Sequence, residues 1–221
     1  MLAQDLVSNL IPAVTGSDTV SQVIDRMVEF RVAHLPVVDH GEYLGLISEK
    51  DVREFTDPSQ LIGTQVINLL AISVIENQHV YEVIDLVSRY ELTLLPVLTP
   101  GKEYKGSITL PSLVRNFSML TAAGQPGAIL VLSLALQDYS PTMLSRIIED
   151  NNAKMISLYV IPDPNGRELT ATIKVNTEET SSLMRSFDRY GYTVKSYFLA
   201  NSQLDDFYRS RYEEFMKYMN I

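Results

Sequence analysis

An internal repeat of about sixty residues limits what the first half of the chain can fold into. A shift of 60 positions aligns apolar residues of one segment with those of the next: Val20 with Val80, Val23 with Val83, Ile24 with Ile84, Leu35 with Leu95 and Pro36 with Pro96. After an extra residue at Lys102, a shift of 61 positions aligns Tyr43, Gly45 and Ile47 with Tyr104, Gly106 and Ile108. We therefore predict two copies of one folding unit.

Each copy has the same order of local patterns. Val20, Val23 and Met27 recur every three or four residues, which is typical of an amphipathic helix that Ser17 or Asp18 caps. Two short β-rich runs follow, joined by a turn that contains Gly41 or Gly101. A second short helix is expected at 49–55 in the first copy and at 110–117 in the second. One such unit is too small to bury its sheet alone, so we expect the two copies to pack face to face.

The residues that carry a family resemblance lie in the two β-rich runs. The first copy has His34-Leu-Pro-Val-Val-Asp39 and then Gly45-Leu-Ile-Ser-Glu-Lys-Asp51. Their counterparts are Leu94-Leu-Pro-Val-Leu98 and Gly106-Ser-Ile-Thr109. On these residues, 1–120 resembles a tandem pair of cystathionine-β-synthase (CBS) domains, also called a Bateman module. The resemblance implies repeat 1 at 1–60 and repeat 2 at 61–120.

The resemblance implies an adenosyl ligand, an AMP-like nucleotide or S-adenosylmethionine, in a cleft between the copies. A carboxylate accepts hydrogen bonds from both vicinal hydroxyls of a ribose, and Asp51 stands at that position of the family pattern, with the Ser48 hydroxyl three residues earlier. The residues that would line the adenine side are Val14, Thr15, His34, Leu35 and Pro36. Thr109 keeps the hydroxyl in the second copy, but Ser112 replaces the aspartate, so we expect at most one competent site.

Two further considerations bear on this site. Ser48 and Asp51 are also residue types that begin a helix, so a purely structural role stays open. Residues 1–120 hold eight Lys or Arg and fifteen Asp or Glu, which disfavours a triphosphate. A monophosphate or an adenosyl ligand with an uncharged tail is more compatible with this negative electrostatic potential.

The second half has a different pattern of residues and shows no copy of the repeat. A small, turn-rich linker is expected at 121–127. It precedes a strand at 128–136, a helix at 140–151, strands at 155–161 and 168–175, a helix at 178–190 and a strand at 192–198. Thr177 is expected to cap the second of these helices. That order is βαββαβ, the ferredoxin-like arrangement. Residues 128–200 resemble the ACT domain, a regulatory unit that often binds amino acids at dimer interfaces. Asp138 and Pro141 match its ligand loop, although Thr142 replaces the usual glycine, which makes sheet-to-sheet dimerisation the favoured role.

The last segment, 201–221, has an apolar stripe at helical spacing. The stripe consists of Leu204, Tyr208, Tyr212, Phe215 and Met219. We predict a C-terminal helix that packs on its own domain or on a partner subunit.

Composition excludes several classes of protein. The net charge of −9 argues against non-specific nucleic-acid binding, and the absence of Cys removes disulfides and thiolate chemistry. We see neither an apolar run long enough to span a bilayer nor a signal peptide, which favours a cytoplasmic protein without a membrane partner. The three His residues, 34, 40 and 79, suggest no metal site, and no nucleophile motif is present, so we expect a non-enzyme without a cofactor.

Together these features predict an α+β regulatory protein: a tandem CBS domain pair followed by a ferredoxin-like, ACT-like domain. The domain order resembles the acetoin-utilisation regulatory protein type. We expect a homodimer that senses an adenosyl small molecule and transmits its state through the ACT-like domain to the dimer interface or to a regulated protein partner. The alternative is a constitutive assembly scaffold whose ligand clefts are filled by side chains.

Overall fold

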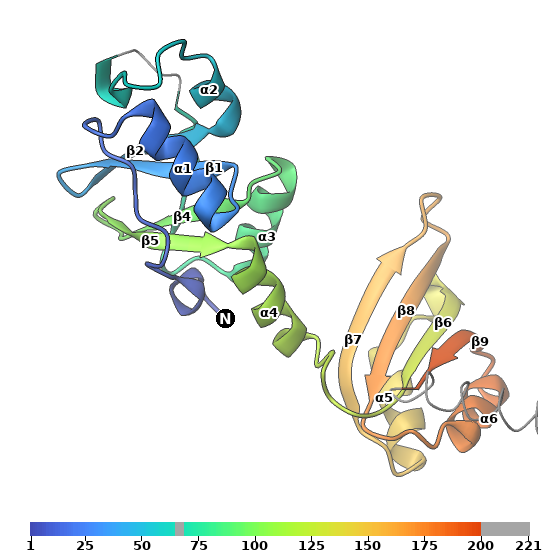
Figure 1. Cartoon of the computed structure of the whole chain (residues 1–221). Helices are drawn as coiled ribbons and strands as arrows, with labels where there is room; N and C mark the ends of the chain where they lie inside the picture. The colour runs from blue at the N-terminus through green and yellow to red at the C-terminus, as the bar shows by residue number, and fades with distance from the viewer. Residues whose placement is uncertain (65–68, 200–221) are drawn as a thin grey trace, which may run out of the picture. The chain divides into compact units, whose positions relative to one another are not determined.

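Two copies of a helix, a hairpin and a second helix make up the first part of the chain (Figure 1). The computed structural model describes residues 1–64 and 69–199. Repeat 1 contains α1 (Val20–Phe30), β1 (His34–Asp39), β2 (Glu42–Ser48) and α2 (Glu49–Arg53). Repeat 2 contains β3 (Val74–Ile75), α3 (Val80–Arg89), β4 (Leu94–Leu98), β5 (Tyr104–Thr109) and α4 (Leu110–Leu120). Two short 3-10 helices, η1 (Ala3–Leu6) and η2 (Ile62–Thr64), complete the elements of this part.

The repeat predicted from the sequence is visible in the strand register. β1 and β2 pair antiparallel with Val37 opposite Gly45, and β4 and β5 pair in the same way with Val97 opposite Gly106. Val14 forms a parallel bridge to Val37, and Val74 lies parallel to Val97 at the equivalent place. Apolar residues of both copies belong to one core, because neither hairpin has enough partners to bury its apolar face alone.

The N-terminus of α1 differs from the prediction. Thr19, rather than Ser17 or Asp18, is the capping residue, because its hydroxyl accepts from the Gln22 N–H at 3.3 Å and Gln22 bonds back to the Thr19 N–H at 2.8 Å. Asp18 instead forms a partly buried ion pair with Arg26 at 2.7 Å. Burial raises the pKa of the Asp18 carboxyl, but the hydrogen bonds from Arg26 and Thr15 outweigh it and leave that pKa lowered.

Gly45 and Gly106 allow other parts of the chain to lie against the two hairpins. Gly45 has φ +151°, and a Cβ there would lie 2.6 Å from the Leu69 Cβ. Leu70 pairs with Leu46 beside it, just as Ser8 pairs with Ser107 in repeat 2. The glycines are therefore required by close approach of the chain itself.

The two repeats meet at two ends. At one end the rings of Tyr43 and Tyr104, equivalent residues of the repeat, stack with centroids 6.5 Å apart, and burial raises the pKa of both phenols. At the other end the Ala33 N–H donates to the Thr93 hydroxyl at 3.0 Å. These contacts fix how the two hairpins face each other.

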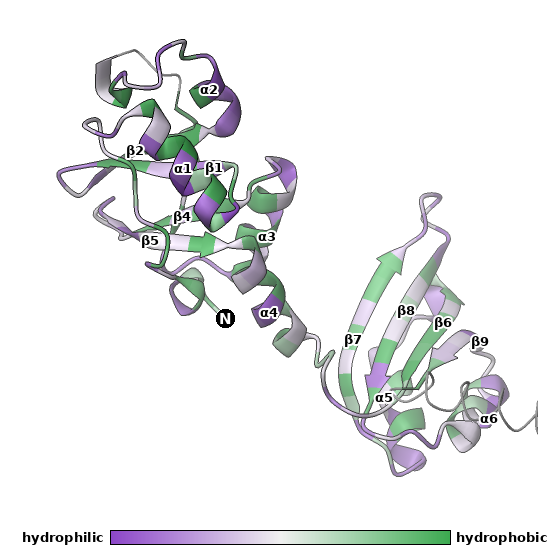
Figure 2. Ribbon diagram, viewed as in Figure 1, coloured by the Kyte–Doolittle hydropathy of each residue, from purple (hydrophilic) through white to green (hydrophobic). Residues whose placement is uncertain are grey.

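The second part has the predicted βαββαβ order. Its elements are β6 (Ile129–Ala135), η3 (Leu136–Asp138), α5 (Pro141–Asp150), β7 (Met155–Pro162), β8 (Glu168–Val175), α6 (Ser181–Arg189) and β9 (Thr193–Phe198). The strands form an antiparallel sheet in the order β7-β8-β6-β9, which is the ferredoxin-like topology. Hydrophobic and polar residues alternate along β7 and β8 (Figure 2). The mixed α+β fold class is thus confirmed.

Helices α5 and α6 share the core of this part with the sheet. Leu144, Ile147 and Phe187 are fully buried against Leu130 and Ile173. Ser140 caps α5 as predicted, since its hydroxyl accepts from the Met143 N–H at 3.3 Å. These contacts bury the apolar stripes that the sequence shows.

Thr177 does not cap α6, contrary to the prediction. Its hydroxyl accepts from the Glu179 N–H at 3.1 Å within a turn, and the helix begins only at Ser181. The side chain therefore stabilises a local turn instead of the first helical turn.

The chain divides into two units, Met1–Phe117 and Ser118–Ile221, so the division falls within α4. The predicted linker at 121–127 follows this helix directly. The predicted C-terminal helix at 201–221 lies outside the described residues. In the described part of the chain, none of the helices is long and apolar enough to cross a membrane.

Candidate functional site

Ser48 and Asp51 lie where β2 ends and α2 begins, and they bond to each other. The Ser48 N–H and hydroxyl both donate to Oδ2 of Asp51, at 2.9 and 2.5 Å. The Asp51 N–H donates to the Ser48 hydroxyl at 3.2 Å. This is a reciprocal capping box, which holds the half-buried carboxylate in one orientation.

The two carboxylate oxygens of Asp51 therefore differ in how many hydrogen bonds they accept. Oδ2 already accepts two hydrogen bonds from Ser48, which uses both of its lone-pair positions. Oδ1 accepts none from any residue that the structure describes, so it has capacity for a further donor. Chemically, the arrangement offers an oriented carboxylate oxygen at the start of a short helix.

His34 lies near this carboxylate and joins the two repeats. Its Nδ1 lies 3.2 Å from the Thr93 hydroxyl and accepts from the Thr93 N–H at 3.4 Å. Because that amide is an obligate donor, the hydrogen-bond network assigns the ring proton to Nε2. Burial lowers the pKa of His34, and the negative charge of Asp51 offsets this only in part.

The remaining residues predicted for the adenine side lie together along β1. The Val14 N–H donates to the Pro36 carbonyl and the Val14 carbonyl accepts from the Val38 N–H, both at 2.8 Å. Val14 and Leu35 are fully buried, so their side chains belong to the core, whereas Thr15 is exposed. Their part in binding adenine stays a prediction, and any ligand would meet a backbone that is largely paired already.

The equivalent position in repeat 2 has a different chemistry. The Thr109 hydroxyl accepts from the Ser112 N–H at 3.3 Å, which is half of the capping box seen in repeat 1. The Ser112 hydroxyl lies 3.5 Å from the Leu6 carbonyl. Repeat 2 thus keeps the scaffold of the site without its carboxylate.

In the second unit, the two residues predicted for the ligand loop, Asp138 and Pro141, lie in different surroundings. Asp138 lines a pocket of about 670 Å³, together with Glu168 and Lys195, and its carbonyl accepts from the Tyr192 hydroxyl at 3.3 Å. Pro141 is the exposed first residue of α5. Of the two predicted loop residues, Asp138 is the one that faces a cavity.

Two contacts between the repeats, at opposite ends of their interface, were not predicted from the sequence. Thr93 carries no motif, and only its place before β4, next to the position equivalent to His34, could have suggested a contact with repeat 1. The Tyr43–Tyr104 stack had a signal, since the repeat aligns the two residues.

A comparison with known protein families finds a match for the region that contains Ser48 and Asp51. Residues 3–57 match the family model of the CBS domain. That span contains Val14, His34, Ser48 and Asp51. The tandem arrangement, the ACT-like assignment and the acetoin-regulator type stay predictions.

Several solved structures are similar to part of the chain. A CBS domain pair/ACT domain protein from Thermotoga maritima is 21% identical, with a TM-score of 0.49, over 54% of this chain and 98% of its own. The CBS domains of a transcriptional regulator from Streptococcus pneumoniae are 18% identical, with a TM-score of 0.46, over 52% and 98%. CBSX2 in complex with AMP is 18% identical, with a TM-score of 0.45, over 53% and 96%.

Proposed function

We propose that the chain is a non-catalytic regulatory protein that binds an adenosyl ligand through repeat 1. The observation that carries this proposal is the match of residues 3–57 to the CBS domain model, which includes Ser48 and Asp51. The oriented carboxylate of Asp51 adds chemical support, because its Oδ1 is not bonded to a described residue and two ribose hydroxyls need an anionic acceptor.

The charges of the first unit limit the ligand. Residues 1–120 carry fifteen acidic against eight basic side chains, so each phosphate added to a ligand meets more repulsion. An AMP-like monophosphate and S-adenosylmethionine are therefore preferred over ATP. The ribose hydroxyls would bond Oδ1, or displace the Ser48 hydroxyl from Oδ2.

The proposed output is a shift between orientations of the two repeats. Such a shift requires that the ligand bind one orientation more tightly than the other. The contact of Ala33 and His34 with Thr93 joins the repeats close to Asp51, so a ligand there would alter it. We propose that a homodimer carries this change, through the ACT-like unit, to a protein partner.

A constitutive scaffold is the second candidate, and a specific observation favours it. The capping box accounts for Ser48 and Asp51 without any ligand, and the backbone of Val14 is paired with β1. In that case the clefts would serve only to join the two repeats.

Calorimetric titration of the full chain with AMP, S-adenosylmethionine and ATP separates the two candidates. We expect AMP or S-adenosylmethionine to bind and raise the melting temperature, because a ligand of the folded state stabilises it. Asp51→Ala should weaken binding by about 10- to 100-fold, the effect of losing hydrogen bonds to a charged group. The matched control, Ser112→Ala, alters the equivalent residue of repeat 2 and should leave the affinity unchanged.

Two results would count against the proposal. Equal affinity in the wild type and Asp51→Ala would exclude this carboxylate as the ribose acceptor. The absence of binding and of any melting shift with all three ligands would favour the scaffold.

A further inference from the structure

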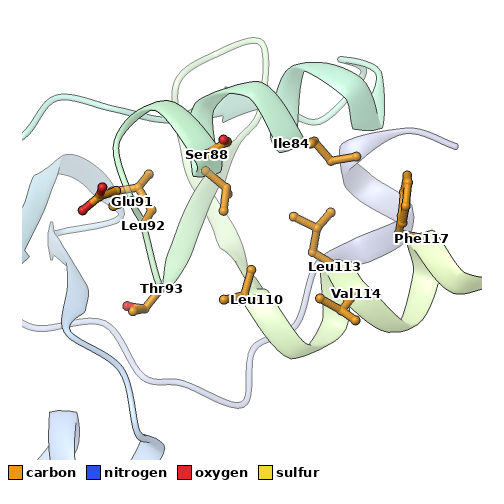
Figure 3. Close-up of a pocket in the computed structure, with 10 residues that line it drawn as sticks. Ile84, Ser88, Glu91, Leu92, Thr93, Leu110, Leu113, Val114 and Phe117 are labelled. Atoms are coloured by element: carbon orange, nitrogen blue, oxygen red, sulfur yellow. The ribbon is translucent and has the colours of Figure 1, made fainter. Parts of the chain in front are cut away.

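Two surfaces of the described chain gather exposed apolar side chains. In the first unit they line a pocket of about 480 Å³, where Ile84 of α3 and Leu113 of α4 point toward each other (Figure 3). In the second unit they lie on one face of the sheet. The sheet face differs from the pocket in one respect, because the described part of the chain ends at Leu199, directly after β9 of that sheet.

Helices α5 and α6 cover one face of this sheet, where Leu130, Leu132 and Ile173 are buried. The alternate residues of each strand point to the other face, which we call the open face. The strand register arranges its residues in rows across the sheet. The first row is Phe198, Ile129, Lys174 and Ser157, the second is Ser196, Val131, Thr172 and Tyr159, and the third includes Ser133, Thr170 and Ile161.

The open face is more apolar than a solvated sheet face. An antiparallel strand with one face in water normally alternates apolar and polar residues, but β6 begins Ile-Leu-Val-Leu and is apolar on both faces there. Ile161 is 64% exposed on β7, and Phe198 is 54% exposed on β9, at the two edges of the sheet. Thr170 and Thr172, in the middle, are small enough to let another backbone come close. This pattern favours a cover over this face.

Lys174 adds a charge that the open face does not neutralise. Its side chain is buried, and its Nζ donates to the Gly127 carbonyl at 3.2 Å. No carboxylate of the described residues, 1–64 and 69–199, forms an ion pair with it. An ammonium group has three donors, and a buried charge is stabilised by an opposite charge. An anionic group beside the first row would therefore stabilise the open face.

The sequence of 201–221 matches these requirements. Its apolar stripe, from Leu204 to Met219, covers 16 residues, which is about 24 Å of helix, and β8 with its eight residues is about 26 Å long. At 3.6 residues per turn, Asp205 flanks the stripe and Asp206 lies opposite to it. β9 ends in the first row, so a turn at 200–203 would bring Asp205 to Lys174.

We propose that residues 204–219 form a helix that covers the open face of the sheet in its own chain, with Asp205 paired with Lys174. The helix runs back along β8 and β6, so that Tyr208 lies near Thr172 of the second row. This inference does not depend on ligand binding by repeat 1. A sheet-to-sheet dimer would need the same face, so it would require release of this segment.

Thiol cross-linking tests the position of the helix, and the chain offers a clean background because it has no Cys. In the full chain, Thr172→Cys is combined either with Tyr208→Cys, on the stripe, or with Asp206→Cys, on the opposite side. The two tethers have nearly the same length, so an undocked segment would react equally in both. We expect an intramolecular disulfide in most molecules of the first variant and at least about fivefold less in the second, because a disulfide needs close and correctly directed Cβ atoms.

Three results of the cross-linking would overturn the proposal. Equal yields in the two variants would mean that the segment has no fixed side toward the sheet. The absence of a disulfide in both would place the segment elsewhere. A covalent dimer on a non-reducing gel, in place of the intramolecular product, would assign the segment to the sheet of a second copy.

Hydrogen exchange read by mass spectrometry tests the apolar contact. The amides of 204–219 should be protected in the wild type, and Ile161→Asp, at an exposed position of the open face, should make them exchange at least about tenfold faster. The matched control is Leu136→Asp, which is 57% exposed in the same unit but outside the rows of the open face, and it should change nothing. Unchanged protection of β8 shows that the sheet stays folded. Unprotected amides in the wild type, or equal exchange in the two variants, would overturn the proposal.

The same measurement tests the ion pair. Asp205→Asn removes the proposed partner of Lys174, so the amides of 204–219 should exchange about three- to tenfold faster. Asp206→Asn removes the same charge one residue away, on the side that faces water, and should change the exchange by less than about twofold. Equal effects of the two variants would overturn the pairing of Asp205 with Lys174.

Discussion

Repeat 1 and repeat 2 share a backbone but differ in the side chains that they present. Val23 and Val83 are both fully buried, as are Leu35 and Leu95. The positions that face other groups have diverged: Asp51 against Ser112, His34 against Leu94, Arg31 against Glu91 and Arg53 against Val114.

This difference separates what packing requires from what binding requires. The shared core accepts no polar or much smaller side chain at its positions, so both copies keep the same apolar pattern. The sites at the helix starts are under no such limit. A repeat that has the glycine and the capping hydroxyl but no carboxylate, as repeat 2 does, can still fold as the partner of repeat 1.

The largest effects should come from the positions that the repeats share. Leu35→Ala and Leu95→Ala each remove a fully buried side chain from the core, and each should lower the free energy of unfolding by about 3 kcal/mol. Urea denaturation of the two variants gives the values. Costs that differ by more than about 1 kcal/mol would show that the two halves of the core are not equivalent.

Gly45→Ala tests the close approach of the chain to the hairpin. The new Cβ would lie 2.6 Å from the Leu69 Cβ, at a φ that side chains rarely adopt, so we expect a loss of about 2 kcal/mol. The control is Gly101→Ala, where the nearest atom is 3.6 Å away and the backbone is unstrained. If both variants unfold at the same urea concentration, the contact with Leu69 is not a constraint.

Much of this architecture was predictable from the sequence, because periodic patterns of apolar residues report burial directly. The repeat, the order of strands and helices in both units and the end of α6 before Gly191 all follow from such patterns or from a single local residue.

The errors occurred where a choice between neighbouring residues depended on distant ones. Asp18 is a good capping residue in isolation, but Arg26, two turns into the helix, bonds it and leaves the cap to Thr19. Thr93 gains its contact with His34 only after the two repeats pack together. The role of Gly45 likewise depends on Leu69, which is distant in sequence.

Asp51→Ser converts the capping box of repeat 1 into the arrangement of repeat 2. Ser48 loses the acceptor for its N–H and hydroxyl, so we expect stability to fall by about 1 kcal/mol even without ligand. Thermal unfolding measures the loss. Ser112→Ala, in repeat 2, removes only a 3.5 Å contact with Leu6 and should cost less. A larger loss in Ser112→Ala would mean that the capping box contributes little.

The smallest effect should be the pH dependence that His34 of repeat 1 gives to the stability. Burial lowers the pKa of His34, so the unfolded chain binds a proton at this residue more readily than the folded chain. Stability should therefore fall as the pH drops below about 6.5, the ordinary histidine value, and level off below the folded-state pKa. Protonation also removes the lone pair of Nδ1 that accepts from the Thr93 N–H, which loosens the contact between the repeats. Replacing His34 by the residue of repeat 2, His34→Leu, should flatten this part of the profile in urea titrations between pH 5 and pH 8. An unchanged slope in that variant would assign the pH dependence to other groups.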